Sequence, residues 1–427
     1  MPRPSPTRGA RTALHRIGRS RLLIFIALLG PGLITANADN DAGGITTWSV
    51  AGARYGYSLL WVLLLITPIL AVTQEMGARM GAVTGKGLAA LIRERFSLKV
   101  TAFAMLCMLI ANFGTTVAEF SGVAAGAGLF HVPSWVSVPL VAISVWVLMT
   151  RGSYWRVEKV FLFLCLIYFT YIIAGVLAHP DWHAAARGTF VPTVQWNTAW
   201  LLMVIAAIGT TITPWGQFFI QASVVDKKVA VRNYIYLKIE VYVCAVLTNT
   251  IDFFIVVACA GTLWVGGVGV DSAADAAKAL GPLAGEFAYA LFAIGLLNVS
   301  ILAAGILPLA TAYAICEAFG FEGGLNKSFS EAPIFNGLLT LCIFVPALVA
   351  MIPGLPLLAV MIISQDINGM LLPVILIYVL KVINDRSVMG EHVNGPIYNA
   401  VAWSFALLLI GLSVVLVAST LPLPFGL

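Results

Sequence analysis

The sequence predicts an all-α polytopic membrane protein, and two observations lead to that prediction. Of its 427 residues, 60% are hydrophobic and 10% are charged, whereas soluble domains have roughly half and a quarter. Apolar runs of about twenty residues recur from Leu22 to Leu421, and each is long enough to cross a bilayer core of about 30 Å. The composition excludes a soluble globular protein, and a net charge of only +5, spread over loops, argues against a nucleic-acid partner.

The apolar runs divide into eleven predicted spans. They cover residues 22–53, 57–80, 98–128, 133–151, 155–178, 199–225, 232–264, 284–316, 333–352, 356–381 and 398–421. Residues 1–21 form a basic tail without the small-residue cleavage site of a signal peptide. We expect a first five-helix repeat over 22–178, a second over 199–381, and an eleventh helix over 398–421.

The positions of Lys and Arg predict the orientation. With the N-terminus inside, all of the 24 Lys and Arg residues except Arg54, Arg187 and Lys278 fall in the tail or in loops on the cytoplasmic side. Positively charged loops resist translocation. We therefore expect a protein of the bacterial plasma membrane with a cytoplasmic N-terminus and a C-terminus outside.

Spans 1 and 6 contain polar and helix-breaking residues where the bilayer midplane should be. Span 1 holds the segment Asn37–Gly44, and span 6 holds Thr210, Thr211, Thr213 and Pro214. Irregular backbone at this depth is tolerated only where it lines a cavity or is buried in protein. The interruptions are five spans apart, and a repeat with an odd number of spans is inserted with inverted topology. The pattern predicts an inverted five-plus-five repeat with unwound helices 1 and 6 around a transport site.

Both interruptions offer backbone oxygens to a cation. Pro214 has no N–H, so the carbonyl of Thr210 loses its helical partner. Gly43 and Gly44 are expected to let the backbone leave the helix and to free the carbonyl of Ala38. Freed carbonyls at the C-terminal ends of half-helices attract cations.

The acids of span 1 need a compensating charge at this depth, and a cation supplies it. Asp41 is the expected central ligand, and the hydroxyl of Thr213 is a further donor. An all-oxygen set suits Mg²⁺, Ca²⁺ or Mn²⁺, whereas softer ions prefer His, Cys or Met. Further candidates, binding through water or shaping the approach, are Asn40, Asp39, Glu119, Asp366 and Asn368. Asp252 and Glu286 lie nearer the predicted span ends, so we expect interfacial structural roles for them.

The six cysteines mostly sit inside apolar runs and form no CxxC pair. We expect them to be small core residues rather than disulfides or zinc ligands. They are Cys107, Cys165, Cys244, Cys259, Cys316 and Cys342.

Four segments resemble the NRAMP family of divalent metal transporters. They are GPGLITANADNDAGGITTWSVAGARYGYSLLWVLLL, VTGKGLAALIRERF, the AEF of span 3 and the SQDINGMLLP of span 10. The resemblance covers the ten-span core. It implies the LeuT-like (APC) form of the inverted repeat, also seen in amino-acid transporters, with an eleventh transmembrane helix.

The departures from the family pattern are informative. The family's Asp-Pro-Gly-Asn aligns with Asp41–Gly44, so the metal-binding Asp is present and the Asn ligand is absent. The metal-binding Met and the His of the sixth-span signature are replaced by Thr213 and Trp215. The acidic pair of span 3 falls on Thr116 and Glu119, and span 9 lacks the family's arginines. These losses resemble the NRAMP-related magnesium transporters, a branch that carries Mg²⁺ and Mn²⁺ without proton coupling.

We therefore expect a secondary transporter, not an enzyme, that takes up Mg²⁺ and also Mn²⁺ by alternating access. It is expected to act as a monomer in the bilayer, with no cofactor besides the transported ion. One alternative is a proton-coupled Mn²⁺ transporter in which Asp39 or Glu119 carries the proton. Another is a Na⁺-coupled carrier of a small organic solute, bound at the half-helix that starts at Trp215. An intramembrane enzyme or a receptor is disfavoured, because the spans hold no His-Glu metal motif and no nucleophile with a base.

Overall fold

The computed structural model describes residues 40–151, 169–229, 231–278, 281, 288–325 and 327–420. The long helices of this part are α4 (Ala42–Tyr55), α5 (Leu60–Thr84), α7 (Leu98–Gly128), α8 (Ser134–Arg151), α12 (Thr198–Thr211), α13 (Pro214–Asp226), α14 (Tyr234–Cys259), α17 (Ala288–Phe319), α18 (Pro333–Ala350), α19 (Leu357–Ile383) and α21 (Pro396–Thr420). Shorter elements are α6 (Leu88–Arg95), α10 (Phe169–Leu177), α11 (Trp182–Phe190), η2 (Val231–Asn233), η3 (Ala260–Trp264), α15 (Ala273–Ala277) and α20 (Arg386–Met389).

The predicted helical membrane architecture is confirmed over the described residues. Nine helical segments there are long and apolar enough to span a membrane, and they coincide with predicted spans 2–4 and 6–11. Predicted spans 1 and 5 are described only in their second parts, as α4 and α10. The tail and residues 22–39 lie outside the described part of the chain.

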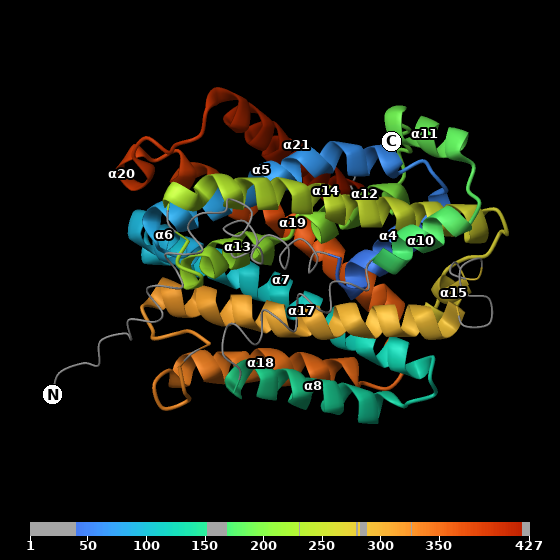
Figure 1. The fold of residues 1–427 in the computed structure, drawn as a ribbon, viewed down its shortest axis with the longest axis horizontal. Helices are drawn as coiled ribbons and strands as arrows, with labels where there is room; N and C mark the ends of the chain where they lie inside the picture. Colours follow the sequence, from blue (N-terminus) through green and yellow to red (C-terminus); the bar gives the residue numbers. More distant parts are fainter. Residues whose placement is uncertain are drawn as a thin grey trace, which may run out of the picture.

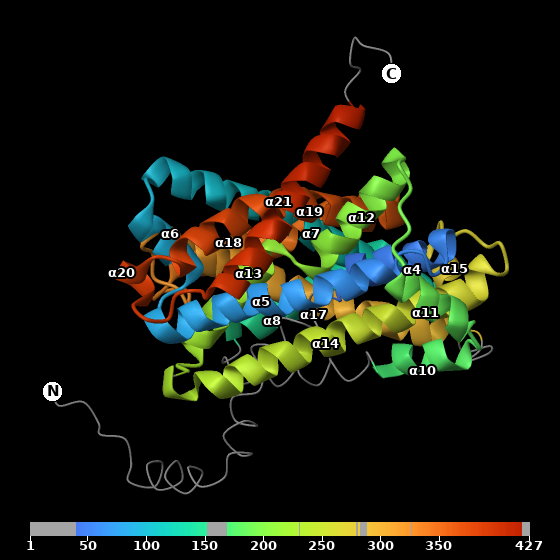
Figure 2. The ribbon, with the colours of Figure 1, turned by 90° about the horizontal axis from the view of Figure 1, so that it is seen from above.

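The long helices run roughly along one common direction, as Figure 1 shows. Helices α8 and α18 lie side by side along one edge and pack against each other, and α17 covers α18 toward the middle of the bundle. Helix α14 packs on α4, α5 and α10, and it runs along one edge of the bundle in the view from above (Figure 2). Helix α19 packs against α4, α7 and α12, and α4 also contacts α7 and α12. These four helices therefore lie together in the bundle.

Two short helices outside the predicted spans mark opposite ends of the bundle (Figure 1). Helix α6 follows α5, which ends at Gly85 in the left-handed conformation with φ 64°. Helix α11 begins where the side chain of Asp181 accepts hydrogen bonds from the backbone N–H groups of His183 and Ala184. Both are too short to give a membrane-span signal, so hydropathy alone did not predict them.

Glycines bring α12 and α19 into backbone contact. A Cβ atom added to Gly209 would lie 2.2 Å from the carbonyl oxygen of Gln365. One added to Gly369 would lie 2.5 Å from the carbonyl oxygen of Ile205. Small residues allow such close crossings between membrane helices. The crossing places Thr210, the next residue of α12, at the level of Gln365.

The described cysteines lie in the interior or partly in it, where small core residues are expected. Cys107, Cys244, Cys259 and Cys316 are buried and Cys342 is partly exposed. Cys165 lies outside the described residues.

Candidate metal-binding site

The sixth span is broken at the predicted position. Helix α12 ends at Thr211 and α13 starts at Pro214, with Ile212 and Thr213 in non-helical conformations between them. The break follows from the chain itself, because a proline has no N–H for the helical ladder and is well placed at the first position of a new helix. The residue four positions before Pro214 is Thr210, whose carbonyl is therefore released from its helical bond.

The two threonines of this break differ in their surroundings. The hydroxyl oxygen of Thr213 accepts a hydrogen bond from the backbone N–H of Gly216 at 3.1 Å, so it caps α13. The hydroxyl oxygen of Thr210 is buried and has no hydrogen-bond partner among the described residues. Thr210 thus offers both a carbonyl and a hydroxyl, whereas the hydroxyl of Thr213 is already engaged by the helix that it caps.

Helix α4 of the first span begins directly after Asp41. Asp41 is the N-cap of α4 and is fully buried, and its Oδ1 accepts from the backbone N–H of Gly44 at 2.6 Å. Gly43 and Gly44 lie inside the first turn, so the prediction that the backbone leaves the helix at these glycines is wrong. The helix begins earlier because an aspartate is a strong N-cap.

Ala38 and Asp39 lie outside the described residues, so their predicted roles in binding remain predictions.

Glu119 of α7 lies against the same helix start. Its Oε2 accepts from the backbone N–H of Ala42 at 3.2 Å, and its side chain is fully buried. The N-terminus of a helix carries a partial positive charge, which disfavours a cation. The carboxylates of Asp41 and Glu119 offset that charge, so the break becomes favourable for a cation.

Sequence reasoning missed one side-chain partner of Asp41, Gln365. The amide nitrogen of Gln365, in α19, lies 3.1 Å from Oδ1 and 3.3 Å from Oδ2 of Asp41. A Cβ added to Gly43 would lie 1.9 Å from that nitrogen, so only glycine leaves room for this contact. Gly43 therefore matters because it leaves space for the Gln365 side chain, and not because it unwinds the helix.

A hydrogen-bonded chain, which we call the site network, extends from Asp41 into α19 and α7. The side-chain amide of Asn368 donates to the side-chain oxygen Oε1 of Gln365 at 2.9 Å and to the hydroxyl of Thr115 at 3.0 Å. Gln365 and Asn368 are three residues apart, which places them on one helix face. That spacing was visible in the sequence and indicated Gln365 as much as Asn368.

Asp366 lies beside the site network without a described hydrogen bond to it. Its side chain is 8% exposed, and one of its carboxylate oxygens is buried without a hydrogen-bond partner in the described part of the chain. A binding role for Asp366 stays a prediction.

The prediction of an interfacial role for Asp252 is wrong. Asp252 is 1% exposed and lies well inside the span Val231–Trp264. It faces Asn40: when the Asn40 amide is oriented to satisfy both of its polar atoms, its nitrogen lies 2.8 and 3.1 Å from the two Asp252 oxygens. The structure therefore brings Asp252, Asn40 and Asp41 together. Glu286 lies outside the described residues.

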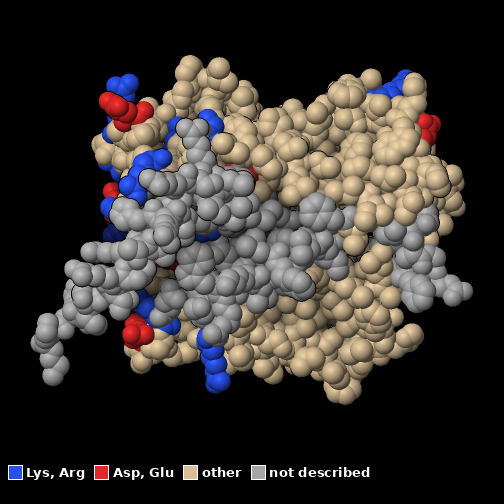
Figure 3. Space-filling model, in the orientation of Figure 1, with Lys and Arg blue, Asp and Glu red and all other residues tan. Residues whose placement is uncertain are grey.

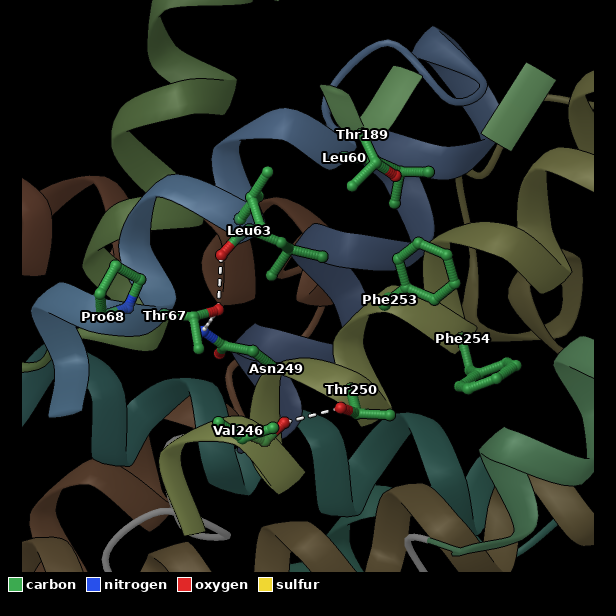
Figure 4. Close-up of a pocket in the computed structure, with 11 residues that line it drawn as sticks. Leu60, Leu63, Thr67, Pro68, Thr189, Val246, Asn249, Thr250, Phe253 and Phe254 are labelled. Carbon is green, nitrogen blue, oxygen red and sulfur yellow. Dashed lines mark hydrogen bonds between the residues drawn. The ribbon is translucent and has the colours of Figure 1, made fainter. Parts of the chain in front are cut away.

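A separate pocket opens between α5, α11 and α14 (Figure 4). It has a volume of about 550 Å³, and no acidic or basic residue lines it. Thr67 and Asn249 meet at its wall, where the Asn249 amide donates to the Thr67 hydroxyl at 2.7 Å. Its apolar lining does not suit a dication.

Solved structures of other proteins share this fold. The structure matches the manganese transporter of Eremococcus coleocola, solved with an aromatic bis-isothiourea compound, with a TM-score of 0.74 and 19% identity over 98% of this chain and 88% of that one. It also matches MhsT in complex with L-phenylalanine, with a TM-score of 0.58 and 14% identity over 94% and 99% of the two chains. These likenesses show the predicted LeuT-type fold.

The sequence gives the family. Residues 32–419 match the model of the natural resistance-associated macrophage protein-like (Nramp) family, and the chain belongs to it. It is 30% identical to the divalent metal cation transporter MntH of Deinococcus radiodurans, over 93% of this chain and 90% of that protein. It is 28% identical to the protein of the same name from Granulibacter bethesdensis, over 97% and 94%. These names describe transporters and not enzymes, in agreement with the prediction, and the chain is an integral membrane protein.

Proposed function

We propose that this Nramp protein is a secondary transporter that takes up divalent cations by alternating access, with Mg²⁺ as the physiological substrate and Mn²⁺ as a second one. The observation that carries the proposal is the setting of Asp41. It is a fully buried acid at the start of α4, and in the described part of the chain it forms no ion pair with Lys or Arg. A carboxylate at membrane depth requires compensation, and a bound dication provides it.

The donor chemistry supports a hard ion. Asp41, Thr210 and Thr213 offer only oxygens, and the amide of Gln365 adds one more oxygen if it turns. Mg²⁺ prefers octahedral oxygen coordination and keeps several waters. A site with one carboxylate, released carbonyls and a hydroxyl in place of a thioether suits a partly hydrated ion. Mn²⁺ accepts the same ligands, in keeping with the divalent metal named for the relatives.

The distribution of charge supports uptake driven by the membrane potential. Lys and Arg gather at the end of the molecule that holds α6 and α20 (Figure 3), and we infer that this end is cytoplasmic. The N-terminus is then inside and the C-terminus outside, as the span count predicts. An entering dication gains about 4.6 kcal/mol per 100 mV of inside-negative potential, twice the value for a unit charge. This gain drives uptake without a proton.

One specific contact favours a second candidate, a proton-coupled Mn²⁺ transporter. Glu119 is fully buried, bonds to Ala42 next to Asp41, and keeps its other carboxylate oxygen without a hydrogen-bond partner in the described residues. A buried acid beside an ion ligand is a natural proton carrier. The two candidates differ in one measurable consequence, acidification of the compartment that the metal enters.

The test is metal influx into liposomes that contain the full chain, an internal pH probe and an imposed inside-negative potential. Mg²⁺, Mn²⁺, Ca²⁺ and Cd²⁺ are compared. We expect Mg²⁺ and Mn²⁺ to enter without acidification. Influx with acidification supports the proton-coupled candidate, and the absence of any Mg²⁺ or Mn²⁺ influx refutes the proposal.

A further inference from the structure

A second buried acid, Asp252 of α14, lies beside the start of α4. Asp252 is 1% exposed, and in the described residues no Lys or Arg pairs with it. Its partner is Asn40, the residue directly before Asp41, whose amide nitrogen lies 2.8 and 3.1 Å from the two carboxylate oxygens in the orientation given above. The Asp252 carboxylate therefore contacts Asn40, one residue before the proposed ion ligand Asp41.

Helix α14 is held firmly against α4. A Cβ added to Gly52 of α4 would lie 2.7 Å from the carbonyl oxygen of Val256 and 2.8 Å from the Cβ of Cys259. Val256 lies one turn beyond Asp252, so both residues share the face of α14 that is turned toward α4. Because this contact is backbone-close, the Asp252 carboxylate sits at a fixed height beside the start of α4.

We propose that Asp252 is a positioning and specificity-determining residue for ion binding. Its carboxylate holds Asn40, which fixes the backbone at residues 40 and 41 and directs the Asp41 carboxylate toward the break in span 6. It also adds a negative charge close to the site, which favours a dication over a monovalent ion, because electrostatic attraction grows with ion charge in a poorly screened interior. The inference rests on the proposed function, in which Asp41 binds the ion.

The experiment measures Mn²⁺ affinity of the purified full chain by metal titration of its thermal unfolding, with and without excess Na⁺. A ligand that binds only the folded protein raises its stability in proportion to its affinity. The variants are Asp252→Asn, Asn40→Ala, the double variant and Asp252→Glu. The control is Glu240→Gln, which neutralises an equally buried acid of the same helix, about 18 Å away along the axis.

We expect Asp252→Asn to weaken Mn²⁺ binding by roughly tenfold to a hundredfold, as losses of residues that orient a metal ligand do, and to make it more sensitive to Na⁺. Asp252→Glu should recover part of the affinity, and Glu240→Gln should leave it unchanged. Because Asp252 acts through Asn40, the Mn²⁺ affinity of the double variant should be close to that of the single variant with the lower affinity. If the two residues acted independently, the losses of the single variants would add.

Two results overturn the inference. One is an Asp252→Asn protein that binds Mn²⁺ as tightly as the wild type, and the other is full additivity in the double variant. If Asp252→Asn does not fold, Asn40→Ala breaks the same contact from the other side, and unchanged affinity in it has the same meaning. A wild-type protein that shows no metal-dependent stabilisation refutes the proposed function itself, which distinguishes the two failures.

Discussion

The crossing of α12 and α19 gives a prediction that can be worked out from distances. In a Gly209→Ala variant, the new methyl group would lie 2.2 Å from the carbonyl oxygen of Gln365 and 2.4 Å from the backbone nitrogen of Gly369. Ordinary contacts start near 3.4 Å. Backbone atoms cannot rotate away as a flexible side chain can, so the two helices have to separate by about 1 Å. Overpacking of this kind costs about 1–3 kcal/mol.

The separation also reaches the ion site. It moves Gln365 relative to Asp41, where the amide nitrogen now lies 3.1 and 3.3 Å from the carboxylate oxygens. An added ångström takes these contacts out of hydrogen-bonding range. Losing the group that orients a metal ligand weakens binding by roughly tenfold to a hundredfold. Gly209→Ala should therefore lose both stability and Mn²⁺ affinity.

The assay is thermal unfolding of the purified protein with a Mn²⁺ titration, beside the matched variant Gly337→Ala in α18. A Cβ at Gly337 meets nothing within 4 Å, and alanine favours a helix over glycine by up to about 1 kcal/mol. Gly337→Ala should thus be at least as stable as the wild type, with unchanged affinity. If Gly209→Ala behaves like Gly337→Ala in both measurements, the helix crossing described here is incorrect.

Three further substitutions test individual ligands and their support. Asp41→Ala should fold and lose Mn²⁺ influx in liposomes, because the central carboxylate is gone; retained influx would place the ion elsewhere. Thr213→Met should gain interaction with Cd²⁺, measured as Cd²⁺ inhibition of Mn²⁺ influx, since a thioether is a soft ligand; no gain would mean that position 213 does not face the ion. Gln365→Leu should weaken Mn²⁺ affinity by roughly tenfold to a hundredfold in a titration, and more than Thr115→Val, which alters only the far end of the site network. Equal effects of these last two would show that the contact with Asp41 is not the important one.

The features that local chemistry dictates could be predicted from the sequence. The apolar runs gave the spans, because burial in a bilayer requires them whatever the neighbours are. The break at Pro214 was predicted correctly, since a missing N–H interrupts the helical ladder in any context. The role of Asp41 as a helix cap was not predicted, and this role is why α4 starts before Gly43.

The features that depend on packing between distant segments could not be predicted. Gln365 reaches Asp41 over 324 positions of sequence, and Asp252 meets Asn40 from a helix six spans further on. Hydropathy places such residues in a span without saying which neighbour they face. The prediction for Asp252 used its position along the span. That position does not determine which helix face is turned toward the interior.

The central claim is that a dication sits between the two breaks, bound by Asp41 and by oxygens of the segment Thr210–Thr213. Anomalous diffraction from crystals grown with Mn²⁺ tests it most directly. We predict a single strong peak at coordination distance from Asp41 and facing Thr210, and its loss in crystals of Asp41→Ala. A peak elsewhere in the bundle, or one that survives in Asp41→Ala, would contradict the claim.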